Sequence, residues 1–180
     1  MNIIGGKLKG KKLLGPKGYF IRPAMALTRK SIFDTLQNII DNASVLDLYA
    51  GTGIVGIEAL SRGAKELILV DANKDSICLI YKNLNLCNVK AKVVLGRLPK
   101  VLEAGIFKDK QFDIIFIDPP YGKEEQIERI LELIDKNKLI KSGGVISIES
   151  EMKAQFNLPK DLKLYKEKKL GNTKITILNS

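Results

Sequence analysis

The 180-residue sequence contains no histidine and has two cysteines, Cys78 and Cys87. The absence of histidine excludes the Ser-His-Asp and Cys-His designs of nucleophilic catalysis. Without histidine and without a CxxC pair, we also expect no zinc site. Two cysteines cannot form a disulfide framework for a domain of this size, so we expect both thiols to be reduced and mostly buried. Any chemistry must therefore depend on carboxylates, lysine, tyrosine and backbone groups.

Long apolar runs are also missing. No stretch approaches the roughly 20 apolar residues that span a bilayer. Residues 1–20 show no apolar segment followed by a small-residue cleavage site. We therefore expect a cytoplasmic, monomeric protein with no membrane and no metal partner. The length and the apolar fraction of 45% fit one globular domain over residues 1–180, divided into a basic extension, 1–22, and a core, 23–180.

Acidic residues are absent from residues 1–33, which contain eight lysines and arginines. Residues 152–180 contain seven basic and two acidic residues, so the net charge of +10 arises at the two ends of the chain. A polyanionic partner such as a nucleic acid would explain this distribution, whereas the alternative is a solvated basic surface. The residues that we expect to contact nucleic-acid phosphates are Lys7, Lys9, Lys11, Lys12, Arg22 and Arg29.

The middle of the chain alternates between strand and helix patterns. Continuously apolar runs such as residues 114–117 predict strands that are buried on both faces. Strand–helix alternation predicts an α/β fold with a mostly parallel sheet covered by helices on both faces. We expect a short irregular hairpin over 3–14 and a C-terminal antiparallel hairpin from runs 163–168 and 174–178. The other predicted strands are 44–48, 66–70, 91–95, 112–117 and 145–149, and the predicted helices are 23–40, 53–61, 74–86, 99–103 and 124–136.

A glycine-rich loop follows the first predicted strand, in the segment VLDLYAGTGIVG at 45–56. In an open α/β sheet, ligands bind at the carboxyl ends of the strands, where the strand order reverses. Gly51 and Gly53 allow close approach of a ligand to the backbone, and Asp71, which ends the next strand, can accept hydrogen bonds from ribose hydroxyls. We expect the neighbouring residues Tyr49, Ala50 and Ala72 to line the same site.

This segment also satisfies the G-x-G-x-x-G pattern of nicotinamide dehydrogenases, so that interpretation is an alternative. Asp47, four residues before the first glycine, argues against it. A carboxylate at that position repels a pyrophosphate, whereas it suits a cationic sulfonium ligand with an amino group. A third interpretation is a glycine turn that only packs a helix on a strand, and Asp71 argues against that one.

The fourth predicted strand ends in the motif Asp118-Pro119-Pro120-Tyr121. Asp118 and the carbonyl group of Pro119 can both accept hydrogen bonds from one amino group, and Tyr121 can stack on a base. Two acceptors suit an exocyclic base amine, because they draw its protons as the nitrogen attacks a methyl group. The alternative is a plain turn with a helix-capping acid. With the glycine loop and Asp71 present, the motif favours a methyltransferase that acts on a base amine.

The chain resembles the RsmD-type 16S ribosomal RNA guanine-N2 methyltransferases across nearly its full length. The matching segments are IIGGKLKGKKL at 3–13, RP at 22–23 with Arg29 and Phe33, LDLYAGTGIVGIEALSRGA at 46–64, IDPPY at 117–121, IESE at 148–151, and Gly171.

This resemblance implies the class I methyltransferase fold, with a seven-stranded sheet, and S-adenosyl-L-methionine as cofactor. It also implies N2-methylation of a loop guanine in small-subunit ribosomal RNA, in an assembled or assembling subunit. At the adenine position, where the resemblance implies a small polar or acidic residue, this chain has Arg97 and Leu98.

Two other functions stay open. One is an amino-methyltransferase that acts on guanine N2 of transfer RNA or adenine N6 of DNA, although 180 residues leave no room for an added target-recognition domain. The other is a non-catalytic RNA-binding assembly factor on a methyltransferase fold, against which the intact Asp47, Asp71 and DPPY residues argue.

Overall fold

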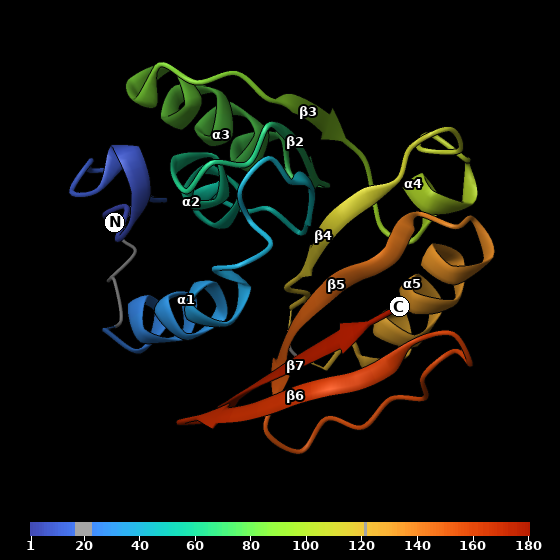
Figure 1. The fold of residues 1–180 in the computed structure, drawn as a ribbon. Coiled ribbons are helices and arrows are strands. Elements are labelled where there is room, and N and C mark those ends of the chain that lie inside the picture. The colour runs from blue at the N-terminus through green and yellow to red at the C-terminus, as the bar shows by residue number, and fades with distance from the viewer. Residues whose placement is uncertain (17–22, 121) are drawn as a thin grey trace.

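The computed structural model describes residues 1–16, 23–120 and 122–180. Seven strands form a single sheet in the order β3-β2-β1-β4-β5-β7-β6 (Figure 1). The strands are β1 (Ser44–Leu48), β2 (Glu66–Asp71), β3 (Lys92–Leu95), β4 (Phe112–Ile117), β5 (Ile140–Glu151), β6 (Lys163–Leu170) and β7 (Thr173–Asn179).

All neighbouring strands from β3 to β5 are parallel, and β7 lies antiparallel between β5 and β6. The predicted C-terminal hairpin is therefore confirmed, and its second strand is the one that pairs with β5. The strand order reverses between β1 and β4, because β2 and β3 extend the sheet on one side and β4 starts the other. This reversal places the carboxyl ends of β1 and β4 side by side, which is where ligands bind in open α/β sheets.

Helices cover both faces of the sheet, as predicted. One apolar core lies between the sheet and α1, α2 and α3, and the other lies between the sheet and α4 and α5 (Figure 1). The helices are α1 (Pro23–Leu36), α2 (Ile54–Ser61), α3 (Lys74–Cys87), α4 (Lys100–Glu103) and α5 (Glu124–Lys136). The strand order and the helices on both faces agree with the class I methyltransferase fold that the sequence resemblance implies.

The N-terminal segment forms the predicted short, irregular hairpin. It has one antiparallel bridge, between Asn2 and Lys12, and a single turn of 3-10 helix, η1 (Gly6–Leu8). Its backbone bonds both to itself and to side chains of α2 and α3. Leu8 N–H donates to Ser61 Oγ at 2.9 Å, and Leu14 N–H donates to Asn83 Oδ1 at 2.8 Å. The segment is thus fastened across two helices of the core.

Two element bounds differ clearly from the prediction. Helix α1 ends at Leu36 rather than at residue 40, because the chain then turns through Ile39 and Ile40, both of whose N–H groups donate to the Leu36 carbonyl. Strand β5 begins at Ile140, before the Ser-Gly-Gly sequence that predicted a turn. The register of its pairing with β4 shifts between Phe112 and Ile114. The glycines therefore lie in an irregular part of β5, and the strand does not end there.

Candidate active site

A cavity of about 880 Å³ opens at the carboxyl ends of β1, β4 and β5. Four acidic residues line it, Asp47, Asp75, Asp118 and Glu149. Its apolar lining comes from Ile32, Ile54, Val55, Phe116 and Ile117, and from Met1 and Leu14 of the N-terminal segment. Acids placed in a largely apolar hollow are costly unless they serve a ligand, so the cavity is the candidate active site.

The predicted glycine loop forms one wall of this cavity. Gly53 has φ of 76°, a left-handed conformation that favours glycine, and α2 begins directly after it. Gly51 N–H donates to Asp71 Oδ2 at 2.8 Å, and Asn73 N–H donates to Asp71 Oδ1 at 2.8 Å. These two bonds fix the Asp71 carboxylate at the end of β2, and each oxygen keeps a lone pair for a ribose hydroxyl.

A smaller hollow of about 230 Å³ adjoins the first, and Tyr49 lines both. The Tyr49 hydroxyl donates to Gln126 Oε1 of α5 at 3.0 Å, and burial raises the pKa of Tyr49 to about 12. The other predicted cofactor residues in this smaller hollow are Asp71, Ala72, Arg97 and Leu98. The predicted cofactor residues therefore line two adjoining hollows, with Asp47, Ala50 and Gly51 in the larger one, whereas Gly53 lines neither.

Asp47 is the most deeply buried of these acids, with 2% of its surface exposed. Its Oδ2 accepts a hydrogen bond from Gly56 N–H at 3.0 Å. Burial is the main reason that the pKa of Asp47 is raised to about 7; the Gly56 bond opposes this shift, and the nearby Asp71 adds to it. A cation in the cavity would favour the ionised form, so the position fits the positively charged methionine portion of S-adenosylmethionine.

We expect Asp47→Asn to make the ligand-free protein more stable at pH 8 and to weaken its binding of S-adenosylmethionine. The folded-state pKa of Asp47 lies above its unfolded value, so the wild-type protein loses stability as pH rises from about 4 to about 7, by up to about 4 kcal/mol. Asparagine can still accept the Gly56 bond but does not ionise. Urea unfolding at pH 5 and pH 8 measures the difference, and a stability gap that does not widen with pH would contradict this assignment.

Asp118 and Glu149 lie side by side near the carboxyl ends of two neighbouring strands. Asp118 directly follows β4, and Ile117 before it pairs with Ile148 of β5, which precedes Glu149. Asp118 keeps solvent contact within the cavity, yet the protein around it raises its pKa, first through desolvation and then through the charges of Glu149 and Asp47. Desolvation also raises the pKa of Glu149. The two acids therefore compete for ionisation.

Sequence reasoning placed Asp118 but gave Glu149 no role in the site. The signal that could have found it is the strand register. Parallel strands end at the same edge of a sheet, so an acid near the end of β5 comes to lie beside the acid that follows β4. Ser147, two residues earlier on β5, lines the same cavity, and its buried hydroxyl has no hydrogen-bond partner among the described residues.

Two sequence-based expectations need correction, and two others fall on residues outside those that the structure describes. Arg29 was expected to contact phosphate, but its side chain is buried. Its Nη2 donates to the Asn2 carbonyl at 2.8 Å and its Nε lies 3.6 Å from Glu58 Oε2, so it holds the N-terminal segment instead. Cys87 is buried as expected, whereas Cys78 is exposed because its position on α3 faces the cavity. The residues Arg22 and Tyr121 lie outside the described residues.

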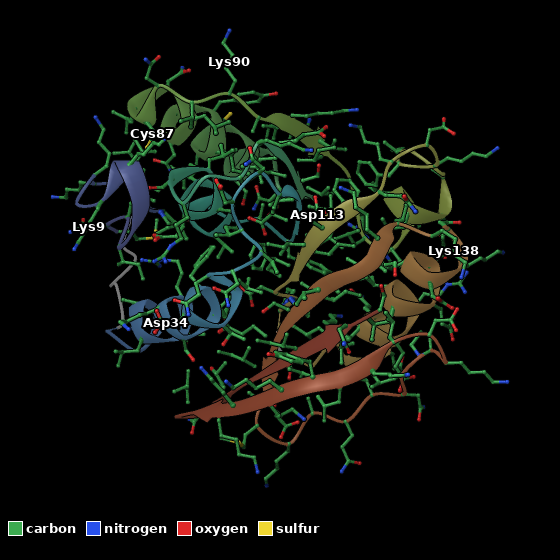
Figure 2. All side chains as sticks on the ribbon, in the orientation of Figure 1. Lys9, Asp34, Cys87, Lys90, Asp113 and Lys138 are labelled. Carbon is green, nitrogen blue, oxygen red and sulfur yellow. The ribbon has the colours of Figure 1, made fainter. Side chains whose placement is uncertain are left out.

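The four predicted phosphate-binding lysines of the N-terminal segment are all exposed. Lys9 extends outward from this segment in Figure 2. Within residues 1–16, 23–120 and 122–180, no acidic side chain pairs with Lys7, Lys9, Lys11 or Lys12. No described helix is long and apolar enough to cross a membrane, and no described group of His, Cys, Asp and Glu side chains is placed to hold a metal ion.

Comparison with known proteins identifies the family. The family model described as "Conserved hypothetical protein 95" matches residues 1–179. Ribosomal RNA small subunit methyltransferase D of Buchnera aphidicola is 35% identical over 92% of this chain and 86% of its own length. The Escherichia coli protein of the same name is 31% identical over 95% of this chain and 85% of its own length. A solved methyltransferase structure from Escherichia coli superposes with a TM-score of 0.87 at 29% identity, covering 99% of this chain and 97% of that one.

These relatives are methyltransferases that span nearly the whole chain, and they support S-adenosyl-L-methionine as the cofactor predicted from the sequence. The chain belongs to the conserved hypothetical protein 95 family, the family of the RsmD-type ribosomal RNA methyltransferases.

Proposed function

We propose that this protein transfers a methyl group from S-adenosylmethionine to N2 of a guanine in 16S ribosomal RNA. The observation that carries the proposal is the position of Asp118, which faces the same cavity as the glycine loop and Asp47. One carboxylate of the cavity thus suits a cationic cofactor and another is free to meet the acceptor amine. The names of the relatives support an RNA of the small subunit as the substrate.

S-adenosylmethionine supplies a methyl group that its sulfonium already activates. The protein then has to position the acceptor and provide a place for the amine's protons. In this proposal Asp118 accepts a hydrogen bond from the exocyclic N2, with the Pro119 carbonyl as second acceptor. Drawing the N–H groups into hydrogen bonds helps the nitrogen lone pair to leave conjugation with the ring. The target base has to leave its stack to reach the cavity, which costs least for a loop nucleotide.

The four exposed lysines of the N-terminal segment would hold RNA phosphates next to the cavity, since Met1 and Leu14 of the same segment line it. We expect replacement of Lys7, Lys9, Lys11 and Lys12 by glutamine to weaken RNA binding. The slope of log affinity against log salt should fall by roughly one unit for each RNA phosphate that is no longer neutralised. Affinity for S-adenosylmethionine should not change.

A matched control replaces four exposed lysines that lie outside the two basic ends, namely Lys90, Lys92, Lys108 and Lys136. Lys90 projects from a different side of the molecule than Lys9 (Figure 2). Both variants lose the same formal charge, so only a local contact explains a difference between them. If both variants gave the same slope of log RNA affinity against log salt, the N-terminal lysines would be solvated surface residues that do not contact RNA phosphates.

The proposed function is tested by incubating the protein with labelled S-adenosylmethionine and, separately, 16S ribosomal RNA, small ribosomal subunits, transfer RNA and duplex DNA. Label recovered as N2-methylguanosine from the first two substrates is the expected result. Transfer to DNA adenine or to transfer RNA would favour the other amino-methyltransferase activity. Binding of S-adenosylmethionine and RNA without transfer to any substrate would favour a non-catalytic assembly factor, and the proposal would then be wrong.

A further inference from the structure

Glu149 is a cavity carboxylate to which the mechanism above gives no task. It lies in β5 two residues after Ser147, and Ser147 pairs with Phe116 of β4. Side chains of a strand alternate between the two faces of a sheet, so Glu149 projects to the same face as Ser147. That face is the one covered by α1, because the ring of Phe116 lies 5.7 Å from the ring of Phe33. Asp118 and Glu149 thus line one cavity from adjacent strands.

Neither carboxylate is neutralised by another side chain of the protein. Among the described residues, no ion pair and no side-chain hydrogen bond involves Asp118 or Glu149. Glu149 contrasts with Glu58, a buried acid that is matched by two arginines. Asp118 is exposed and Glu149 is partly buried, so both carboxylates are accessible to a ligand in the cavity. Two accessible acceptors side by side suit a ligand with two adjacent donors.

Guanine offers such a pair of donors. Its Watson–Crick edge presents N1–H beside the exocyclic N2 amine, whereas adenine presents an acceptor, N1, beside its amine. A carboxylate that faces N1 accepts a hydrogen bond from guanine N1–H. The same carboxylate repels adenine, because its lone pair would meet the lone pair of adenine N1. Two carboxylates on neighbouring strands can serve the two donors of guanine separately.

We propose that Glu149 is a specificity-determining residue that accepts a hydrogen bond from guanine N1–H while Asp118 accepts from N2. This inference rests on the proposed function and extends it, because it assigns the choice of base to a residue other than the one that meets the reacting amine. Both acids are harder to ionise in the ligand-free cavity, since desolvation raises both pKa values. A base that supplies a donor to each restores their ionised forms on binding.

The test uses 2-aminopurine, a base that keeps the exocyclic 2-amine of guanine but has an unprotonated, accepting N1. Two RNAs carry guanine or 2-aminopurine at the nucleotide that the labelling experiment has mapped. Wild-type protein should prefer guanine over 2-aminopurine by about a hundredfold in kcat/KM, because the analogue sets a lone pair against Glu149. Glu149→Gln, whose amide can donate to N1, should reduce that preference to below about tenfold.

Two controls separate the outcomes. Glu151→Gln removes an acid from the same strand that does not line the cavity, and it should keep the wild-type preference. Calorimetric affinity for S-adenosylmethionine should be the same in wild type and Glu149→Gln, which also shows that the variant folds.

If Glu149→Gln retains the hundredfold preference, or if its defect is a weaker affinity for S-adenosylmethionine, the inference is overturned. A wild-type protein that methylates no guanine would instead refute the proposed function. Fluorescence of the 2-aminopurine RNA gives a binding readout that is independent of turnover. The ratio of the affinity for the 2-aminopurine RNA to the affinity for the guanine RNA should be at least tenfold higher for Glu149→Gln than for wild type.

Discussion

Replacing Asp118 with alanine is expected to lower methyl-transfer turnover by roughly a hundredfold or more while S-adenosylmethionine still binds. Asp118 lies at the cavity end of β4, where its carboxylate has no protein partner among the described residues and can meet an exocyclic amine. Alanine removes the acceptor that draws the amine's proton and leaves the glycine loop and Asp71 untouched. The loss should therefore appear in single-turnover rate and not in cofactor affinity.

Two variants sharpen this test. Asp118→Asn keeps one accepting oxygen without a negative charge, so its turnover should fall between those of wild type and Asp118→Ala. Asp113→Asn changes an acid at the opposite end of the same strand, where it accepts from Ser44 N–H at 2.7 Å and pairs with Lys141; Figure 2 labels it. That variant should keep near-normal turnover. Near-normal turnover of Asp118→Ala on the same RNA would rule out the amine-acceptor mechanism.

The pH dependence of the wild-type enzyme follows from the same pair of acids. Because desolvation and the neighbouring Glu149 raise the pKa of Asp118, the accepting form is scarce at low pH. Turnover should therefore rise with pH through the range in which the pair loses its proton, and it should reach a plateau above it.

Much of the fold could be predicted because local patterns and the global architecture agree. Strands β1 and β4 are mostly apolar, and both bury nearly all of their residues between two layers of helices. Their bounds match the prediction at both ends. Asp47 interrupts the apolar pattern of β1, and this predicted a position that faces a ligand. Burying an acid inside a strand is unfavourable, and packing alone does not explain its presence there.

The contacts that the sequence could not predict join segments far apart in the chain. Arg29 stands in a basic run that favours phosphate binding, and its local sequence contains no acid. Its ion pair with Glu58 depends on α1 and α2 packing on one face of the sheet, so no spacing rule relates the two positions. The Glu149–Asp118 juxtaposition similarly depends on the pairing of β4 with β5. Local pattern specified the elements, whereas tertiary packing decided which charged residues are neutralised and which stay free for a ligand.

Removal of the Glu58 carboxylate is the second change with a large expected effect. Glu58 is fully buried on α2, where it accepts hydrogen bonds from Arg62 Nε at 2.9 Å and from Ile4 N–H at 2.8 Å and forms an ion pair with Arg29. Glu58→Gln keeps an accepting oxygen but leaves two nearby arginines without a countercharge in a buried setting. Breaking one side of a buried ion pair costs about 3–5 kcal/mol, so the free energy of unfolding should fall by that order.

Asp34→Asn is the matched control, since it removes an acid from an exposed pair with Lys30, where the side chains stay about half exposed or more. Exposed pairs contribute at most about 1 kcal/mol, so this variant should unfold near the wild-type denaturant midpoint. Arg29 and Glu58 together hold the backbone at Asn2 and Ile4, and the lysines expected to bind RNA follow directly after. Under conditions where Glu58→Gln still folds, RNA affinity should therefore decline more than S-adenosylmethionine affinity. If the two affinities fall equally, or if the variant unfolds like Asp34→Asn, the arginine pair around Glu58 does not fasten the N-terminal segment to the core.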